Sequence, residues 1–341
     1  MTIKAARFVT GASGLELTAD ERRFIAESRP FGLIVFRRNV ESRDQLRALC
    51  DEFRSLVGWH APVLVDQEGG RVQRLGPPTW AKMPSASRLA DAATSCGDDL
   101  LRIAGRLLAA DLLDAGINVD CAPCLDLAIP GQSNVIGDRS YGADPDRVAS
   151  LAGSLAQGLL DGGVLPVIKH IPGHGRALVD SHEKLPVVDT DLATLRSSDF
   201  RPFKALAHLP AGMTAHVVYT AIDPDRPATT SETMIRDIIR GEIGFDGLLF
   251  SDDVSMGALD GSLGDRSRRT LDAGCDLVLH CNGDLAEMQA VAEAAPMLSG
   301  PSLKRAEAAL AHLTPADAAD LPDLRARLAE VMSAAEGQAG V

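Results

Sequence analysis

The stretch that decides the fold is PVIKHIPGHGRALVDSH, residues 166–182. It opens with an apolar run of strand length, residues 166–170, which ends in a lysine and a histidine. It then turns through Pro172 and two glycines and brings back Asp180 and His182, two residues apart. A buried strand that ends in charged side chains is typical of a parallel sheet, because such sheets carry their functional residues at the carboxyl ends of the strands.

The same pattern recurs along the chain, as short apolar runs that are each followed by a segment with helical periodicity. Eight runs are predicted strands: 6–10, 32–36, 62–67, 118–127, 166–170, 212–216, 247–253 and 276–282. An open doubly wound sheet would also alternate in this way, but no G-x-G-x-x-G follows the first strand. Eight strand–helix units therefore favour a protein of the α/β class, a single (β/α)8 TIM-type barrel.

Helix signals lie between these runs. Thr18 with Glu21 and Ser42 with Gln45 match capping boxes. Glycines stand where helices should end, at positions 58, 116 and 274. No linker or second core interrupts the pattern, so we expect one domain over residues 1–341, with a core of about 6–300 and extra C-terminal helices at 301–341.

Composition narrows the class of protein. The 341 residues carry 47 acidic and 34 Lys or Arg side chains, a formal charge of −13, with no basic cluster for nucleic acid. No apolar run is long enough for a signal peptide or a membrane span. We expect a cytoplasmic monomer that has neither nucleic acid nor a membrane as a partner.

Six cysteines, at 50, 96, 121, 124, 275 and 281, lie mostly in apolar surroundings. This distribution is typical of reduced core thiols rather than a disulfide framework. Cys121 and Cys124 form a C-x-x-C, but no second pair at zinc-site spacing follows, and the run around them is predicted to be a buried strand. No metal or organic cofactor is expected.

Polar residues fall at the predicted strand ends, where a barrel holds its active site. They are Asp66, Asp126, Lys169, His170, His216, Asp252, Asp253 and Asn282. Asp252 emerges from an apolar strand and is predicted to face a pocket, while Asp253 is predicted to cap a helix. Asp66, followed by Arg74, suits the binding of vicinal sugar hydroxyls, and Arg139 lies in a glycine-bounded loop. The glycines around His174 indicate a mobile loop, with a loop-structuring role for that histidine.

Five motifs appear in order over roughly residues 10–290: DQEGGRVQR, GDRSYG, KHIPGHG with DSH, TAHVVY and FSDD. Together they resemble the family 3 glycoside hydrolases, and most of all the single-domain bacterial β-N-acetylglucosaminidases of peptidoglycan recycling. Ile171 stands where many relatives have Phe, a conservative change. Many family members take a carboxylic acid/base from a second domain, which is not expected in this chain.

The resemblance implies roles for eight residues. Asp252 matches the nucleophile, His182 the acid/base, and Asp180 the partner of His182 in a dyad. The positions that would hold N-acetylglucosamine are Asp66, Arg74, Arg139, Lys169 and His170. The implied activity is that of a retaining exo-β-N-acetylglucosaminidase that forms a covalent glycosyl-enzyme, with a histidine in place of the second carboxyl group. The implied small-molecule carbohydrate substrate is a muropeptide fragment, GlcNAc-1,6-anhydroMurNAc with or without its peptide.

Three alternatives stay open on the sequence. A β-N-acetylglucosaminide phosphorylase would use the same fold, since histidine repels phosphate less than a carboxylate does. A metallohydrolase would use His170, His174, Asp180 and His182 as ligands, although their spacing matches no H-E-x-x-H motif. A sugar-binding protein without catalysis is the third alternative.

Overall fold

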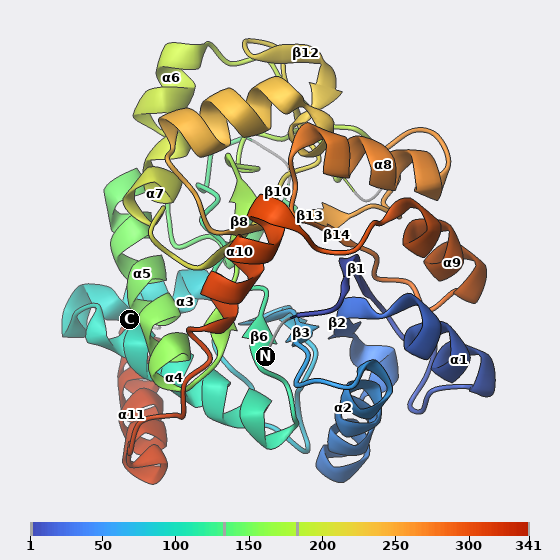
Figure 1. Cartoon of the computed structure of the whole chain (residues 1–341). Coiled ribbons are helices and arrows are strands. Elements are labelled where there is room, and N and C mark those ends of the chain that lie inside the picture. The colour runs from blue at the N-terminus through green and yellow to red at the C-terminus, as the bar shows by residue number, and fades with distance from the viewer. Residues whose placement is uncertain (1–2, 132–133, 182–183, 340–341) are drawn as a thin grey trace.

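The computed structural model describes residues 3–131, 134–181 and 184–339. Its main sheet is parallel, with the order β7-β6-β3-β2-β1-β14-β13-β10-β8. The strands are β1 (Ala6–Thr10), β2 (Pro30–Val35), β3 (Val63–Val65), β6 (Val119–Asp120), β7 (Leu165–Pro166), β8 (Ile168–Ile171), β10 (Ala211–Thr214), β13 (Leu248–Asp253) and β14 (Leu277–Leu279). Because β7 and β8 are two parts of one run, the two ends of this order meet and the sheet closes. Figure 1 shows the resulting barrel, which confirms the predicted fold.

The fourth barrel strand is shorter than predicted. Residues 118–127 were expected to form one strand, but the ladder covers only Val119–Asp120. Pro123 has no N–H to donate, so the run leaves the ladder there. It continues as an irregular segment held to β8 by one bridge, between Cys124 and Lys169. Leu125 N donates to Lys169 O at 2.7 Å, which ties this segment to the strand that carries the lysine.

Helices surround the barrel (Figure 1). They are α1 (Ala19–Ser28), α2 (Arg43–Val57), α3 (Ala86–Cys96), α4 (Asp99–Asp114), α5 (Pro145–Asp161), α6 (Leu192–Ser197), α7 (Phe200–Ala205), α8 (Leu263–Ala273), α9 (Leu285–Ala294), α10 (Gly300–Leu310) and α11 (Leu321–Ala339), with short helices η1 (Arg37–Asn39), η2 (Gly137–Arg139) and η3 (Ala228–Thr230) and the π-helix η4 (Met234–Glu242). Two small sheets flank the barrel: β4 (Gln67–Gly69) with β5 (Val72–Gln73), and β9 (Val187–Val188) with β11 (Val218–Tyr219) and β12 (Asp223–Pro227). None of the helices in the described ranges is long and apolar enough to cross a membrane.

The helix ends follow the sequence closely. The Thr18–Glu21 capping box is present at α1. At α2 the Ser42 side chain accepts from Gln45 N, but the Gln45 side chain accepts from Glu41 N instead of closing the box. Glycines 58 and 274 end α2 and α8 in the left-handed conformation, and glycine 116 follows Ala115, the C-cap residue of α4.

The barrel interior is apolar at one end and polar at the other. Val9, Leu64, Val167 and Phe250 belong to one buried cluster inside the sheet. The same cluster includes Leu298 and two alanines of α10, and Figure 1 shows α10 crossing the barrel. Apolar side chains thus close the amino-terminal end, and the carboxyl ends of the strands are left to form the site.

Candidate active site

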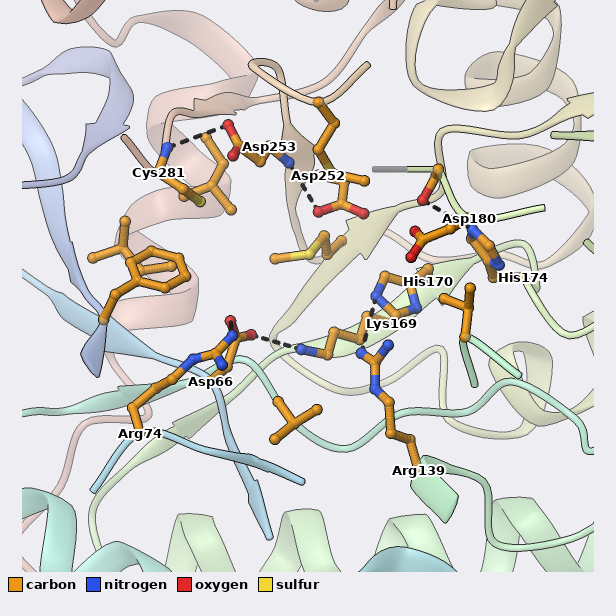
Figure 2. A pocket seen from close by; sticks show the side chains of 18 of the residues that line it. Asp66, Arg74, Arg139, Lys169, His170, His174, Asp180, Asp252, Asp253 and Cys281 are labelled. Carbon is orange, nitrogen blue, oxygen red and sulfur yellow. Dashed lines mark hydrogen bonds and ion pairs between the residues drawn. The ribbon is translucent and has the colours of Figure 1, made fainter. Parts of the chain in front are cut away.

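A cavity of 330 Å³ lies at the carboxyl ends of the strands. Its charged and polar lining includes Asp66, Arg74, Arg139, Lys169, His170, His174, Asp180, Ser181, Asp252 and Asp253 (Figure 2). Seven of the eight predicted site residues therefore line one cavity. The eighth, His182, lies outside the described residues. The structure brings together residues that span most of the chain.

A buried charge cluster forms one side of the cavity. Lys169 Nζ lies 2.8 Å from Asp66 Oδ1 and 2.8 Å from Glu68 Oε1, with only 2% of the lysine side chain exposed. Arg139 binds both oxygens of Glu68, at 2.8 Å each. Arg74 Nη2 lies 2.9 Å from Asp66 Oδ2. Three cations thus surround two carboxylates.

Mutual attraction keeps this cluster charged. Burial by itself would raise the pKa of Glu68, but Arg139 and Lys169 outweigh it and lower that pKa to about 2. Lys169 and Arg74 likewise outweigh burial at Asp66 and hold its pKa well below the ordinary range. Burial would lower the pKa of Lys169, yet Asp66 and Glu68 raise it instead. All the charges of these three residues are therefore present at neutral pH.

Glu68 was not among the predicted site residues. It lies in β4, directly after the strand that ends near Asp66, and only 5% of its side chain is exposed. The spacing could have identified it, because side chains two residues apart in an extended chain lie on the same face, as Asp66 and Glu68 do. The carboxylate of Glu68 orients both Arg139 and Lys169.

Asp252 stands at the end of β13 and is partly exposed in the cavity. Asp253 N donates to Asp252 Oδ1 at 2.8 Å. Burial would raise the pKa of the Asp252 carboxyl, but His170, His216, this N–H and Lys169 outweigh it and lower the pKa. The result is an ionised carboxylate on a rigid strand.

Asp253 does not cap a helix, so that prediction is wrong. The next helix, α8, begins only at Leu263 and is capped by Ser262. The Asp253 carboxylate instead accepts from Ser255 N at 3.0 Å, Ser255 Oγ at 2.7 Å and Cys281 N at 3.2 Å. It therefore joins the ends of β13 and β14 beside Asp252.

Asp126 organises the histidines. Its carboxylate accepts from His170 Nδ1 at 2.6 Å, from His174 N at 2.5 Å and from Cys124 Sγ at 3.1 Å. Burial would raise the pKa of Asp126, but His170 and His174 outweigh it and lower that pKa. The sequence placed Asp126 at a strand end without a role. The structure shows that it fixes the His170 ring, whose Nε2 lies 3.5 Å from Arg139 Nη2.

Cys124, Asp126 and His170 bring ligand atoms within 4.8 Å of one another, as a metal site would require. Burial raises the pKa of the Cys124 thiol well above its ordinary value. Cys124 Sγ and His170 Nδ1 both donate to Asp126 Oδ2, and these hydrogen bonds by themselves account for the short distances among the three groups. The donor set fits a structural role behind the cavity.

The segment 173–181 leads from β8 back to the cavity. His174 and Ser181 are each 3% exposed, and His174 Nε2 lies 3.2 Å from Ser181 Oγ. The glycines do not make this segment loose at its start. A Cβ on Gly175 would lie 2.2 Å from Leu127 O, so glycine is required there for close packing. The expected mobile loop therefore begins as a buried, hydrogen-bonded turn.

A closed α/β barrel with a cavity lined by carboxylates, guanidinium groups and imidazoles has the architecture of an enzyme that acts on polar, hydroxyl-rich substrates. The family model described as "Glycosyl hydrolase family 3 N terminal domain" matches residues 5–314. The chain therefore belongs to glycosyl hydrolase family 3, and the relatives that it matches at about 40% identity are β-hexosaminidases.

Individual relatives agree with this placement. The chain is 42% identical over 279 residues to a β-hexosaminidase of Alkalilimnicola ehrlichii, covering 80% of this chain and 79% of the relative. It is 38% identical over 340 residues to that of Thiobacillus denitrificans, covering 94% and 90%. Among solved structures it is similar to NagZ from Neisseria gonorrhoeae in complex with N-trifluoroacetyl-D-glucosamine, with a TM-score of 0.84, 30% identity and 98% of each chain covered.

Proposed function

We propose that this chain is a retaining exo-β-N-acetylglucosaminidase. Its substrate would be a muropeptide fragment, GlcNAc-1,6-anhydroMurNAc with or without its peptide. The observation that carries the proposal is the placement of Asp252, an ionised carboxylate at the end of a rigid strand, facing the same cavity as Asp180 (Figure 2). The similar N. gonorrhoeae structure is a complex with an N-acylated glucosamine, which supports an N-acetylglucosamine-type ligand here.

The charge cluster would hold the terminal sugar. The carboxylate of Asp66 can accept hydrogen bonds from hydroxyl groups while Arg74 and Lys169 keep it ionised. Arg139 and His170 would donate to further oxygens of the same ring. Their buried partners hold these side chains in place before the sugar arrives, which lowers the entropic cost of binding.

In the first step, an Asp252 oxygen would attack the anomeric carbon while the glycosidic C–O bond breaks and His182 protonates the departing oxygen. Asp180 would stabilise the imidazolium form of His182. In the second step, neutral His182 would take a proton from water, and that water would cleave the glycosyl ester with overall retention. Histidine suits both roles because its ordinary pKa of about 6.5 lies near neutrality.

Kinetics on chromogenic glycosides test the proposal. Asp252→Ala should abolish turnover of a 4-nitrophenyl β-N-acetylglucosaminide, because the neighbouring carboxylate of β13, Asp253, is held by Ser255 and Cys281 and cannot replace it. The wild type should prefer this substrate over the matching β-glucoside. Equal rates on the two would contradict the N-acetyl assignment.

His182→Ala tests the acid/base role separately. This variant should cleave a 2,4-dinitrophenyl glycoside almost as fast as the wild type in the glycosylation step, because that leaving group departs without a proton. It should lose about 100-fold or more on an alkyl glycoside. An equal loss on both substrates would overturn the assignment.

Two further measurements separate the alternatives. If added phosphate led to the release of a sugar 1-phosphate, the enzyme would be a phosphorylase rather than a hydrolase. Loss of activity in a chelator would favour a metallohydrolase.

We also propose that the chain acts as a monomer in the cytoplasm. Its six free cysteines support the cytoplasmic location.

A further inference from the structure

The turn that begins the segment 173–181 contains a buried histidine for which the proposed mechanism has no use. His174 N donates to Asp126 Oδ1, and its ring lies edge-on to the His170 ring, with centroids 5.8 Å apart. Its Nε2 lies 3.2 Å from Ser181 Oγ. Ser181 directly follows Asp180, and both line the cavity. The side chain thus spans from the strand-end core to the residue beside Asp180.

The choice of histidine here has a cost. Its Nδ1 is buried and has no hydrogen-bond partner among the described residues. A buried polar atom without a partner is destabilising, and a phenylalanine of similar shape would avoid that cost. Burial and the neighbouring His170 lower the pKa of His174 to about 4, so the ring is neutral at working pH. The ring is neutral and only its Nε2 has a hydrogen-bond partner, which is Ser181 Oγ. We therefore take this hydrogen bond to be the function of the imidazole at position 174.

Ser181 is held from its other side as well. Ala258 N donates to Ser181 O at 3.2 Å, from the turn that follows β13. In contrast, Leu178 and Val179, which precede Asp180, are 65% and 38% exposed. The chain is therefore exposed at Leu178 and Val179 and becomes buried again at Ser181. Two hydrogen bonds, one from each side, anchor the end of this excursion.

We propose that His174 is a positioning residue for catalysis: through its ring bond to Ser181 it sets where Asp180 stands in the cavity. His174 touches no reacting atom in this role. Its backbone N–H is bonded to Asp126 and its ring to Ser181, so it connects the end of β8 to the segment that carries Asp180. The inference rests on the proposed function, because Asp180 matters only if it supports the acid/base.

The test compares His174→Phe and Ser181→Ala on two β-N-acetylglucosaminides, one with a 2,4-dinitrophenol and one with an alkyl leaving group. Each variant should lose about 10- to 100-fold in kcat/KM, which reports the glycosylation step, on the alkyl substrate, since misplacing the acid/base by about 1 Å costs that much. Each should lose less than about threefold in kcat/KM on the dinitrophenyl substrate, because that leaving group departs without a proton. The kcat on the dinitrophenyl substrate should fall, because the second step still needs His182 as its base. The double variant should be no slower than the slower single variant, because the two changes remove one interaction.

A purely structural histidine would behave differently. Equal losses of kcat/KM on both substrates, or losses that multiply in the double variant, would overturn the inference. His174→Gln, which retains a polar group that can reach Ser181, should recover part of the alkyl-substrate rate, and no recovery relative to His174→Phe would also count against it. His182→Ala is run alongside. If that variant shows no leaving-group dependence, the acid/base proposal itself fails; if it does and His174→Phe does not, only this inference fails.

Discussion

Replacing Glu68 with glutamine should destabilise the folded protein by about 3–5 kcal/mol. The carboxylate is 5% exposed and is the partner of Arg139 and Lys169. A fall in its pKa from 4.5 to about 2 corresponds, at about 1.4 kcal/mol per pKa unit, to roughly 3 kcal/mol. Removing one partner of a buried ion pair costs a similar amount, because the remaining charges stay buried and under-compensated.

The assay is equilibrium unfolding in guanidinium chloride at pH 7. The matched control is Glu232→Gln, which also breaks an ion pair to an arginine, Arg236, but one in which both side chains are more than half exposed. That control should cost less than about 1 kcal/mol. If Glu68→Gln were no more destabilising than Glu232→Gln, the cluster would contribute no net stability, contrary to this prediction.

The pH dependence has a definite sign. Because folding lowers the pKa of Glu68, its contribution is complete above the unfolded-state pKa of about 4.5. It declines as the pH falls below that value and is gone once the pH passes through about 2. The stability difference between wild type and Glu68→Gln should therefore be constant from pH 5 to 7 and shrink in acid. A difference that grew in acid would contradict this linkage.

Three further outcomes are expected. Asp126→Asn should lower kcat/KM by about 100-fold, because the charge that orients His170 is lost; steady-state kinetics would show a drop of less than threefold if that orientation is unimportant. The acid limb of the pH profile of kcat/KM should lie below pH 3.8, since the pKa of Asp252 is lowered, and a limb above pH 5 would contradict this. Gly175→Ala should unfold at clearly lower denaturant concentration, because its Cβ would lie 2.2 Å from Leu127 O; an unchanged midpoint would show that the backbone can shift freely.

The amino-acid sequence was enough to predict the barrel and the place of its site. Eight apolar runs alternate with helical segments, and a closed parallel sheet brings all its carboxyl ends to one face. For that reason Asp66, Lys169 and Asp252, far apart in the chain, could be predicted to line one cavity. A capping box involves only residues three positions apart, and the one predicted at Thr18 and Glu21 is present in the structure.

Which side chains hold the others became visible only in the folded chain. Glu68 and Arg139 are 71 residues apart, and Asp126 and His174 are 48 apart, so no periodicity or local motif reports their contact. Hydrogen bonds of this kind depend on side-chain direction and on the depth of each residue in the barrel, which a pattern of apolar residues does not encode. The role of Asp253 depends on tertiary structure in the same way, because its distant partner Cys281 comes within reach only when β14 lies beside β13.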